Sequence, residues 1–154
     1  VLPYPLLEIP NVAEVTDRHS ISYERTSSME FVADQFIKFA YDHKFNGFIL
    51  NKIPLIKKLK LRELLGVRMF YGNISDSNNP YLSDDVIYFD RGNDGNIMTN
   101  LLSNKPYWEG YVGLQNIFKI FEVQYYKRLN YVSYPSARED GFWRNLRISI
   151  KFEF

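Results

Sequence analysis

The last nine residues, Leu146-Arg-Ile-Ser-Ile-Lys-Phe-Glu-Phe154, alternate apolar and polar side chains without interruption. Successive side chains of a β-strand point to opposite faces, so the pattern predicts a strand with one apolar face. That face carries Leu146, Ile148, Ile150, Phe152 and Phe154. A strand of this length ending on an aromatic residue is typical of the closing strand of a bacterial outer-membrane β-barrel, between lipid and a wet lumen. The last strand of a soluble β-sandwich gives the same alternation, so both classes stay open at this point.

The composition narrows the class of protein. The chain has 154 residues, a formal net charge of +1 and no cysteine, which leaves no disulfide framework and no cysteine metal site. A nucleic-acid footprint would need a clustered basic excess, and the balanced charge argues against one. Aromatic residues make up 17% of the chain, a level that suits the aromatic girdles of a membrane barrel. The sequence has no apolar run of about 18 residues, so no transmembrane helix is expected.

Five strands of period two are predicted, and connections of unequal length join them. The strands lie at about 29–45, 65–72, 107–115, 121–131 and 146–154. A helix competes for 29–43, but aromatic content and the placement of the charges favour a strand. The connections cover 46–62, 74–106, 115–119 and 133–142. Short periplasmic turns and longer external loops are typical of outer-membrane barrels, so 74–106 and 133–142 are expected to be extracellular.

The organisation predicted from this pattern is an all-β, antiparallel transmembrane barrel of which the chain supplies only the C-terminal part. Residues 29–154 would form five strands, with a long external loop at about 74–106. Five strands do not close an ordinary barrel, and lipid does not tolerate an open sheet edge. Upstream strands of the same protein or a partner chain are therefore expected. Residues 1–28 have no sustained period and carry three prolines in their first ten positions, which predicts an irregular apolar segment.

Three polar residues interrupt the predicted apolar face, and one basic cluster has two interpretations. Gln35, His43 and Lys127 fall where apolar side chains are expected, which favours a soluble protein slightly. Four aromatic residues are expected at the membrane interfaces: Tyr71, Trp108, Tyr131 and Trp143. The basic cluster comprises Lys52, Lys57, Lys58 and Lys60. It is either a solvated connection, which we favour, or a surface against anionic headgroups.

The residues give no sign of catalysis. His19 and His43 have no third ligand beside them, so neither a metal site nor a catalytic role is expected. The polar run at 90–96 lacks the spacing and the distal glutamate of a calcium loop of the EF-hand type. Charges of both signs on the polar faces are explained by cross-strand ion pairing. We therefore predict no enzyme, no cofactor and no metal.

Several blocks of the sequence resemble a known family. They are Leu-Pro-Tyr-Pro-Leu-Leu-Glu-Ile (2–9), Met-Glu-Phe-Val-Ala-Asp-Gln (29–35), His-Lys-Phe-Asn-Gly-Phe-Ile-Leu-Asn-Lys-Ile-Pro-Leu-Ile-Lys-Lys-Leu-Lys (43–60) and Gly113-Leu-Gln-Asn-Ile-Phe-Lys119. Together with the terminal Phe154 they resemble the C-terminal end of an uncharacterised Bacteroidetes outer-membrane family. Its members carry an N-terminal carboxypeptidase-regulatory-like domain followed by a large β-barrel. That barrel is similar to those of the outer-membrane assembly and two-partner secretion superfamily.

The resemblance implies a larger barrel of about sixteen strands in the bacterial outer membrane. It also implies that Pro3, Tyr4 and Pro5 lie in a loop folded into the lumen. The barrel-assembly machinery would read the terminal strand during biogenesis. The expected function is the C-terminal segment of an integral barrel in protein assembly, secretion or translocation. A passive structural or transport pore and a soluble β-barrel ligand-binding protein remain the alternatives.

Overall fold

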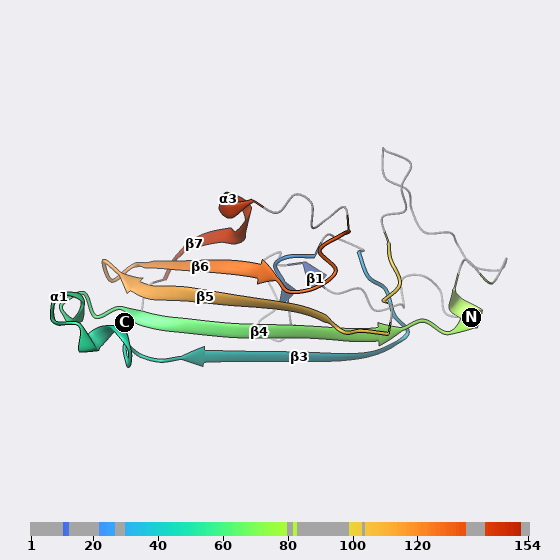
Figure 1. Ribbon diagram of the computed structural model, residues 1–154, viewed down its shortest axis with the longest axis horizontal. Coiled ribbons are helices and arrows are strands. Elements are labelled where there is room, and N and C mark those ends of the chain that lie inside the picture. Colours follow the sequence, from blue (N-terminus) through green and yellow to red (C-terminus); the bar gives the residue numbers. More distant parts are fainter. Residues whose placement is uncertain are drawn as a thin grey trace. The chain divides into compact units, whose positions relative to one another are not determined.

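The computed structural model describes residues 11–12, 22–26, 30–79, 82, 99–102, 104–134 and 141–151. Its main element is an open five-stranded sheet in the order β3-β4-β5-β6-β7, so that each strand pairs with its neighbour in the sequence (Figure 1). The strands are β3 (Gln35–Lys44), β4 (Arg62–Asn73), β5 (Tyr107–Ile117), β6 (Phe121–Arg128) and β7 (Leu146–Ile150). The predicted all-β class and its five antiparallel strands are confirmed. The helix considered for 29–43 is excluded, because 35–44 is strand.

Short helical turns occupy the connections. The β3–β4 connection holds η2 (Leu50–Lys52) and α1 (Pro54–Lys57), with Pro54 at the first turn of the helix, where its missing N–H costs nothing. A further turn, η3 (Asp76–Asn78), follows β4, and α3 (Phe142–Asn145) leads directly into β7. Two short strands, β1 (Asn11–Val12) and β2 (Ser22–Tyr23), pair in parallel. No helix in these described segments is long and apolar enough to cross a membrane.

The strand boundaries differ from the predicted ones for local reasons. Phe31 makes only an isolated parallel bridge, to Asn100, so β3 begins later than the sequence pattern predicts. β6 ends at Arg128, and Tyr131 beyond it adopts a left-handed backbone with φ of 55° that no strand accommodates. Other predicted features lie outside the described residues. These are Pro3, Tyr4, Pro5, the whole of 83–98 within the predicted loop at 74–106, Phe152 and Phe154.

The register of the C-terminal strands is regular. β5 and β6 pair from Glu109 opposite Arg128 to Leu114 opposite Val123, and a bulge then shifts the ladder. β6 and β7 pair from Phe121 opposite Ile150 to Tyr125 opposite Leu146. Because side chains alternate along each strand, this register brings Glu109 of β5, Glu122 and Arg128 of β6 and Ser149 of β7 onto one face. Lys127 of β6 lies on the other face.

The chain divides into two compact units, residues 1–39 with 69–107 and residues 40–68 with 108–154. The core of the first unit is aromatic. Tyr23, Phe31, Phe70 and Tyr107 are all fully buried. The ring of Tyr23 meets those of Phe70 and Tyr107 edge-on at 6.1 and 6.0 Å, and its hydroxyl donates to the carbonyl of Met69 at 2.8 Å.

Candidate functional site

The polar face of the β5–β6 hairpin is buried. Glu109 is fully buried, and Glu122 and Arg128 are each only 2% exposed. On the opposite face of the same sheet, Val112 of β5 is 57% exposed and Ile148 of β7 is 62% exposed. A water-soluble antiparallel sheet normally turns its apolar face to the core and its polar face to solvent. The polarity of this sheet is inverted.

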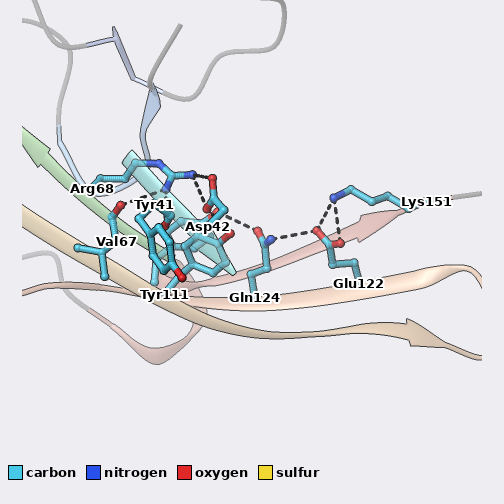
Figure 2. A network of polar contacts seen from close by, with 9 residues as sticks. Tyr41, Asp42, Val67, Arg68, Tyr111, Glu122, Gln124 and Lys151 are labelled. Atoms are coloured by element: carbon cyan, nitrogen blue, oxygen red, sulfur yellow. Dashed lines mark hydrogen bonds and ion pairs between the residues drawn. The ribbon is translucent and has the colours of Figure 1, made fainter. Parts of the chain in front are cut away.

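The polar face continues onto β3 and β4, and the contacts of this half are centred on Asp42, whose side chain is 49% exposed. The Arg68 guanidinium forms an ion pair with the Asp42 carboxylate, with Nη2 2.8 Å from Oδ1 (Figure 2). The same carboxylate oxygen accepts a hydrogen bond from the Tyr111 hydroxyl at 2.6 Å. The Arg68 guanidinium carbon also lies 5.7 Å from the centre of the Tyr111 ring. These three groups come from β3, β4 and β5, so the contacts connect three strands.

The other half runs along β6 to the residue that follows β7. The Tyr126 hydroxyl donates to Oε1 of Gln124 at 2.8 Å, and Nε2 of Gln124 donates to Oε1 of Glu122 at 3.0 Å. Nζ of Lys151 then donates to both Glu122 carboxylate oxygens, at 2.8 and 2.9 Å. Figure 2 shows Gln124 and Glu122 in line, with Lys151 reaching down to the carboxylate. The predicted cross-strand ion pairing is confirmed for Glu122 and Lys151, as it is for Asp42 and Arg68.

Ring contact joins the two halves. The centres of the Tyr111 and Tyr126 rings are 4.8 Å apart, and both residues belong to a small buried cluster with Leu64. The Tyr111 ring occupies the space above Gly66, where a Cβ atom would lie only 1.9 Å from Cε1 of the ring. We call the whole set, from Arg68 through Tyr111 to Lys151, the polar ladder. Sequence reasoning identified its charges but missed Gly66 and the two tyrosine hydroxyls.

The charged groups of the polar ladder are paired with one another. Each of its buried charged groups has an oppositely charged or hydrogen-bonding partner, which is the condition for keeping charge out of bulk water. Glu109 and Arg128, also buried, lie directly opposite each other in the register. Among the described residues no group of three histidine, aspartate or glutamate side chains is placed to hold a metal ion.

A carboxylate clamp lies where β3 begins and β4 has ended. Asp34 accepts hydrogen bonds from the backbone N–H and the hydroxyl of Ser75, and from Nδ2 of Asn78 at 2.7 Å. Burial of Asp34 favours the neutral acid, but the hydrogen bonds from Ser75 and Asn78 outweigh it and hold the pKa of this carboxyl below its ordinary value. The clamp joins the start of β3 to the end of β4.

His43 has an aromatic environment on β3. Its ring lies 4.4 Å from that of Phe45 and 6.1 Å from that of Tyr41, and Nδ1 is 3.2 Å from the Tyr41 hydroxyl. The three residues are spaced by two and share one face of the strand. The histidine that interrupts the predicted apolar face therefore belongs to an aromatic row.

The predicted terminal-strand residues lie on the exposed face where they are described. Ile148 and Ile150 are 62% and 60% exposed, and Leu146 is half-buried. The four predicted interface aromatics come from different parts of the chain: Tyr71 is on β4, Trp108 on β5, Tyr131 beyond β6 and Trp143 on α3. Trp143 is 80% exposed and meets Phe142 edge-on.

Part of the chain matches a protein family. Residues 23–82 match the C-terminal domain of a family of unknown function, DUF5686. This segment includes the whole of β3 and β4 and the 43–60 block, and it supports the resemblance to an uncharacterised family. No curated protein and no solved structure matches the chain.

Proposed function

We propose that the chain forms part of the wall of an integral β-barrel in the bacterial outer membrane. The observation that carries the proposal is the inverted polarity of the sheet, with Glu109, Glu122 and Arg128 buried on one face and Val112 and Ile148 exposed on the other. Strands of a membrane barrel alternate apolar side chains toward lipid with polar side chains toward the lumen. A sheet with a polar buried face and an apolar exposed face fits this arrangement of lipid and lumen.

The sheet edges support the same proposal. Within the described part of the chain, β3 and β7 each have one neighbouring strand and therefore one open edge. Unpaired backbone N–H and C=O groups are costly in lipid, so a membrane sheet needs partners at both edges. Upstream strands of the same protein or a partner chain would supply them and complete a barrel of about sixteen strands.

The finer assignment follows from the family match and the resemblance. We infer that the 23–82 match reflects the Bacteroidetes outer-membrane family, whose members place a carboxypeptidase-regulatory-like domain before the barrel. Similarity to assembly and secretion barrels supports a role in protein assembly, secretion or translocation. The exposed apolar row of Leu146, Ile148 and Ile150, continued by Phe152 and Phe154, would be the signal read by the barrel-assembly machinery.

A passive pore is the second candidate, and the polar ladder is what favours it. Asp42, Arg68, Glu122 and Lys151 place charges of both signs on one face. Such a face suits the wall of a water-filled channel. A soluble ligand-binding barrel would instead require a filled or apolar interior. The buried charges of the β5–β6 hairpin argue against that alternative.

Cell fractionation tests the proposal. The protein is expressed with its natural upstream sequence and a signal peptide, and the outer membrane is isolated. We expect the protein in this fraction, resistant to carbonate and urea washes and with a gel mobility that changes on heating. Recovery as a soluble periplasmic monomer would refute the membrane proposal. Ion conductance in a planar bilayer, measured on the purified protein, then separates an open pore from a closed barrel.

A further inference from the structure

The connection between β3 and β4 is strongly basic. Residues 44–62 contain six lysine or arginine side chains and no aspartate or glutamate. Four of these are the lysines of the predicted basic cluster, and all four are exposed: Lys52, Lys57, Lys58 and Lys60. The excess stands out in a chain whose overall charge is only +1.

Large apolar side chains are exposed among these lysines. Leu55 on α1 is 82% exposed and Phe48 is 68% exposed. Three more are about half exposed: Ile49 (54%), Ile53 (45%) and Leu59 (53%). Single exposed apolar residues are ordinary on a protein surface, whereas five within twelve residues of sequence mark an interaction surface. We call residues 48–60 the basic turn.

The lysines of the basic turn are available for an external partner. The nearest carboxylate in the sequence, that of Glu63, accepts hydrogen bonds from the backbone N–H groups of Gly47 at 2.8 Å, Ile49 at 3.1 Å and Leu50. These hydrogen bonds hold the backbone of the turn and use the oxygens of the Glu63 carboxylate. Lys57, Lys58 and Lys60 make no ion pair with any residue that the structure describes.

The basic turn has a defined backbone. Gly47 and Lys60 adopt left-handed conformations, with φ of 84° and 52°, at its two ends. The side chain of Asn116, at the end of β5, donates to the Lys60 carbonyl at 2.8 Å. Lys52 Nζ lies 4.5 Å from the centre of the Phe48 ring, so one cation already rests on an apolar neighbour. A surface held in this way loses little conformational freedom when it binds.

We propose that the basic turn docks on the anionic headgroup region of a lipid bilayer. Leu55 and Phe48 would enter the interface while Lys57, Lys58 and Lys60 meet lipid phosphates. Lysine carries its charge at the end of an apolar stem, which suits the boundary between lipid headgroups and acyl chains. Clustered lysines beside exposed apolar residues are typical of surfaces that bind anionic lipid. The inference rests on the proposed function for the presence of a bilayer. It adds that the connected ends of β3 and β4 contact anionic lipid, through lysine side chains and exposed apolar residues.

Fluorescence of a labelled side chain tests the inference. The chain has no cysteine, so Leu55→Cys introduces a single thiol for an environment-sensitive fluorophore at a highly exposed position. The full chain is mixed with vesicles of phosphatidylcholine alone or with added phosphatidylglycerol. We expect a blue shift and brighter emission only with phosphatidylglycerol, reduced by added salt. The triple variant K57Q/K58Q/K60Q should weaken binding on the order of 100-fold, about fivefold for each lysine.

The matched variant K57R/K58R/K60R keeps the charge and should retain binding. A fluorophore at Val132→Cys, which is 60% exposed and lies beyond β6, controls for binding unrelated to the basic turn. Emission from position 55 that ignores phosphatidylglycerol, or that persists in the glutamine variant, would overturn the inference. A shift produced by polyglutamate and not by vesicles would overturn it in favour of an acidic protein partner. The fluorophore at position 55 reports lipid contact of the basic turn even if the sheet does not insert into the bilayer. Carbonate extraction tests insertion separately, so a failure of the proposed function can be told apart from a failure of this inference.

Discussion

The two faces of β6 place neighbouring tyrosines in different surroundings. Tyr126 is 8% exposed, and its hydroxyl donates to Gln124 within the polar ladder. Tyr125 points to the other face, where its ring lies 5.6 Å from that of Phe142 and its hydroxyl accepts from Asn145 at 3.4 Å. The two residues are of the same type, but the side chain of Tyr126 is buried and that of Tyr125 is partly exposed. A row of side-chain hydrogen bonds therefore lines the buried face of β6, and the face that carries Tyr125 is more open.

The largest expected effect comes from a charge on the open face. Val112→Arg places a guanidinium where the proposal expects lipid, which should destabilise the protein in vesicles by about 2–4 kcal/mol if the residue lies near the bilayer midplane. Urea unfolding of the vesicle-reconstituted protein measures this. Val132→Arg is the matched control, because Val132 is similarly exposed (60% against 57%) but lies beyond the end of β6. Equal and small effects of the two variants would show that water, not lipid, covers the open face.

The second effect concerns packing on the buried face. Gly66→Ala places a Cβ atom 1.9 Å from the Tyr111 ring, so the ring must move and its hydrogen bond to Asp42 must weaken. Overpacking of this kind should destabilise the protein by about 1–3 kcal/mol. Gly141→Ala is the control, since nothing lies within 4 Å of its added Cβ atom. If both variants unfold at the same urea concentration, the ring contact is not a determinant of stability.

The strands could be predicted from sequence because period-two alternation is a local property. The five expected strands are those of the main sheet in the described part of the chain, with β4 and β5 close to their predicted ranges, and only the short pair β1 and β2 was not expected. The face that would be buried did not follow from alternation alone, since a sandwich and a barrel give the same pattern. It is decided by contacts between distant residues, such as that of Tyr111 with Asp42.

The site was predicted only in part for the same reason. Charges of both signs on one face indicated ion pairing, and Asp42 with Arg68 and Glu122 with Lys151 are such pairs. The role of Gly66 depends on a ring from another strand, and the clamp on Asp34 depends on a turn more than forty positions away, at Ser75. Tyr131 was placed in a strand because its left-handed backbone leaves no trace in the residue pattern.

A smaller effect is expected when one end of the polar ladder is removed. Lys151→Met leaves the Glu122 carboxylate, which is 2% exposed, without its cation and should cost about 2 kcal/mol. The double variant K151M/E122Q removes the stranded charge and should recover part of the loss. Stability of both is measured by urea unfolding. If the double variant is no more stable than the single one, Glu122 is not held by this pair.

The smallest effect tests the clamp and has a defined pH dependence. Asp34→Asn removes the charge that accepts from Ser75 and Asn78 and should cost about 1 kcal/mol at neutral pH. Because the pKa of Asp34 in the folded protein is lowered, its contribution is fully present above the unfolded value of about 3.9. The contribution is lost as the pH falls through the lower folded value. The difference in unfolding free energy between wild type and D34N should therefore be constant at neutral pH and shrink below about pH 4.

Asp76→Asn supplies the matched comparison, because Asp76 is exposed on the neighbouring turn η3 and is not part of the clamp. Surface substitutions of this kind change stability by at most about 0.5 kcal/mol. A D34N deficit that persists unchanged into acid would mean that the geometry of the side chain, rather than its charge, holds the ends of β3 and β4 together. In that case the asparagine amide would be a poor acceptor for Ser75 at every pH. The neutral carboxylic acid of Asp34 at low pH would still accept from Ser75.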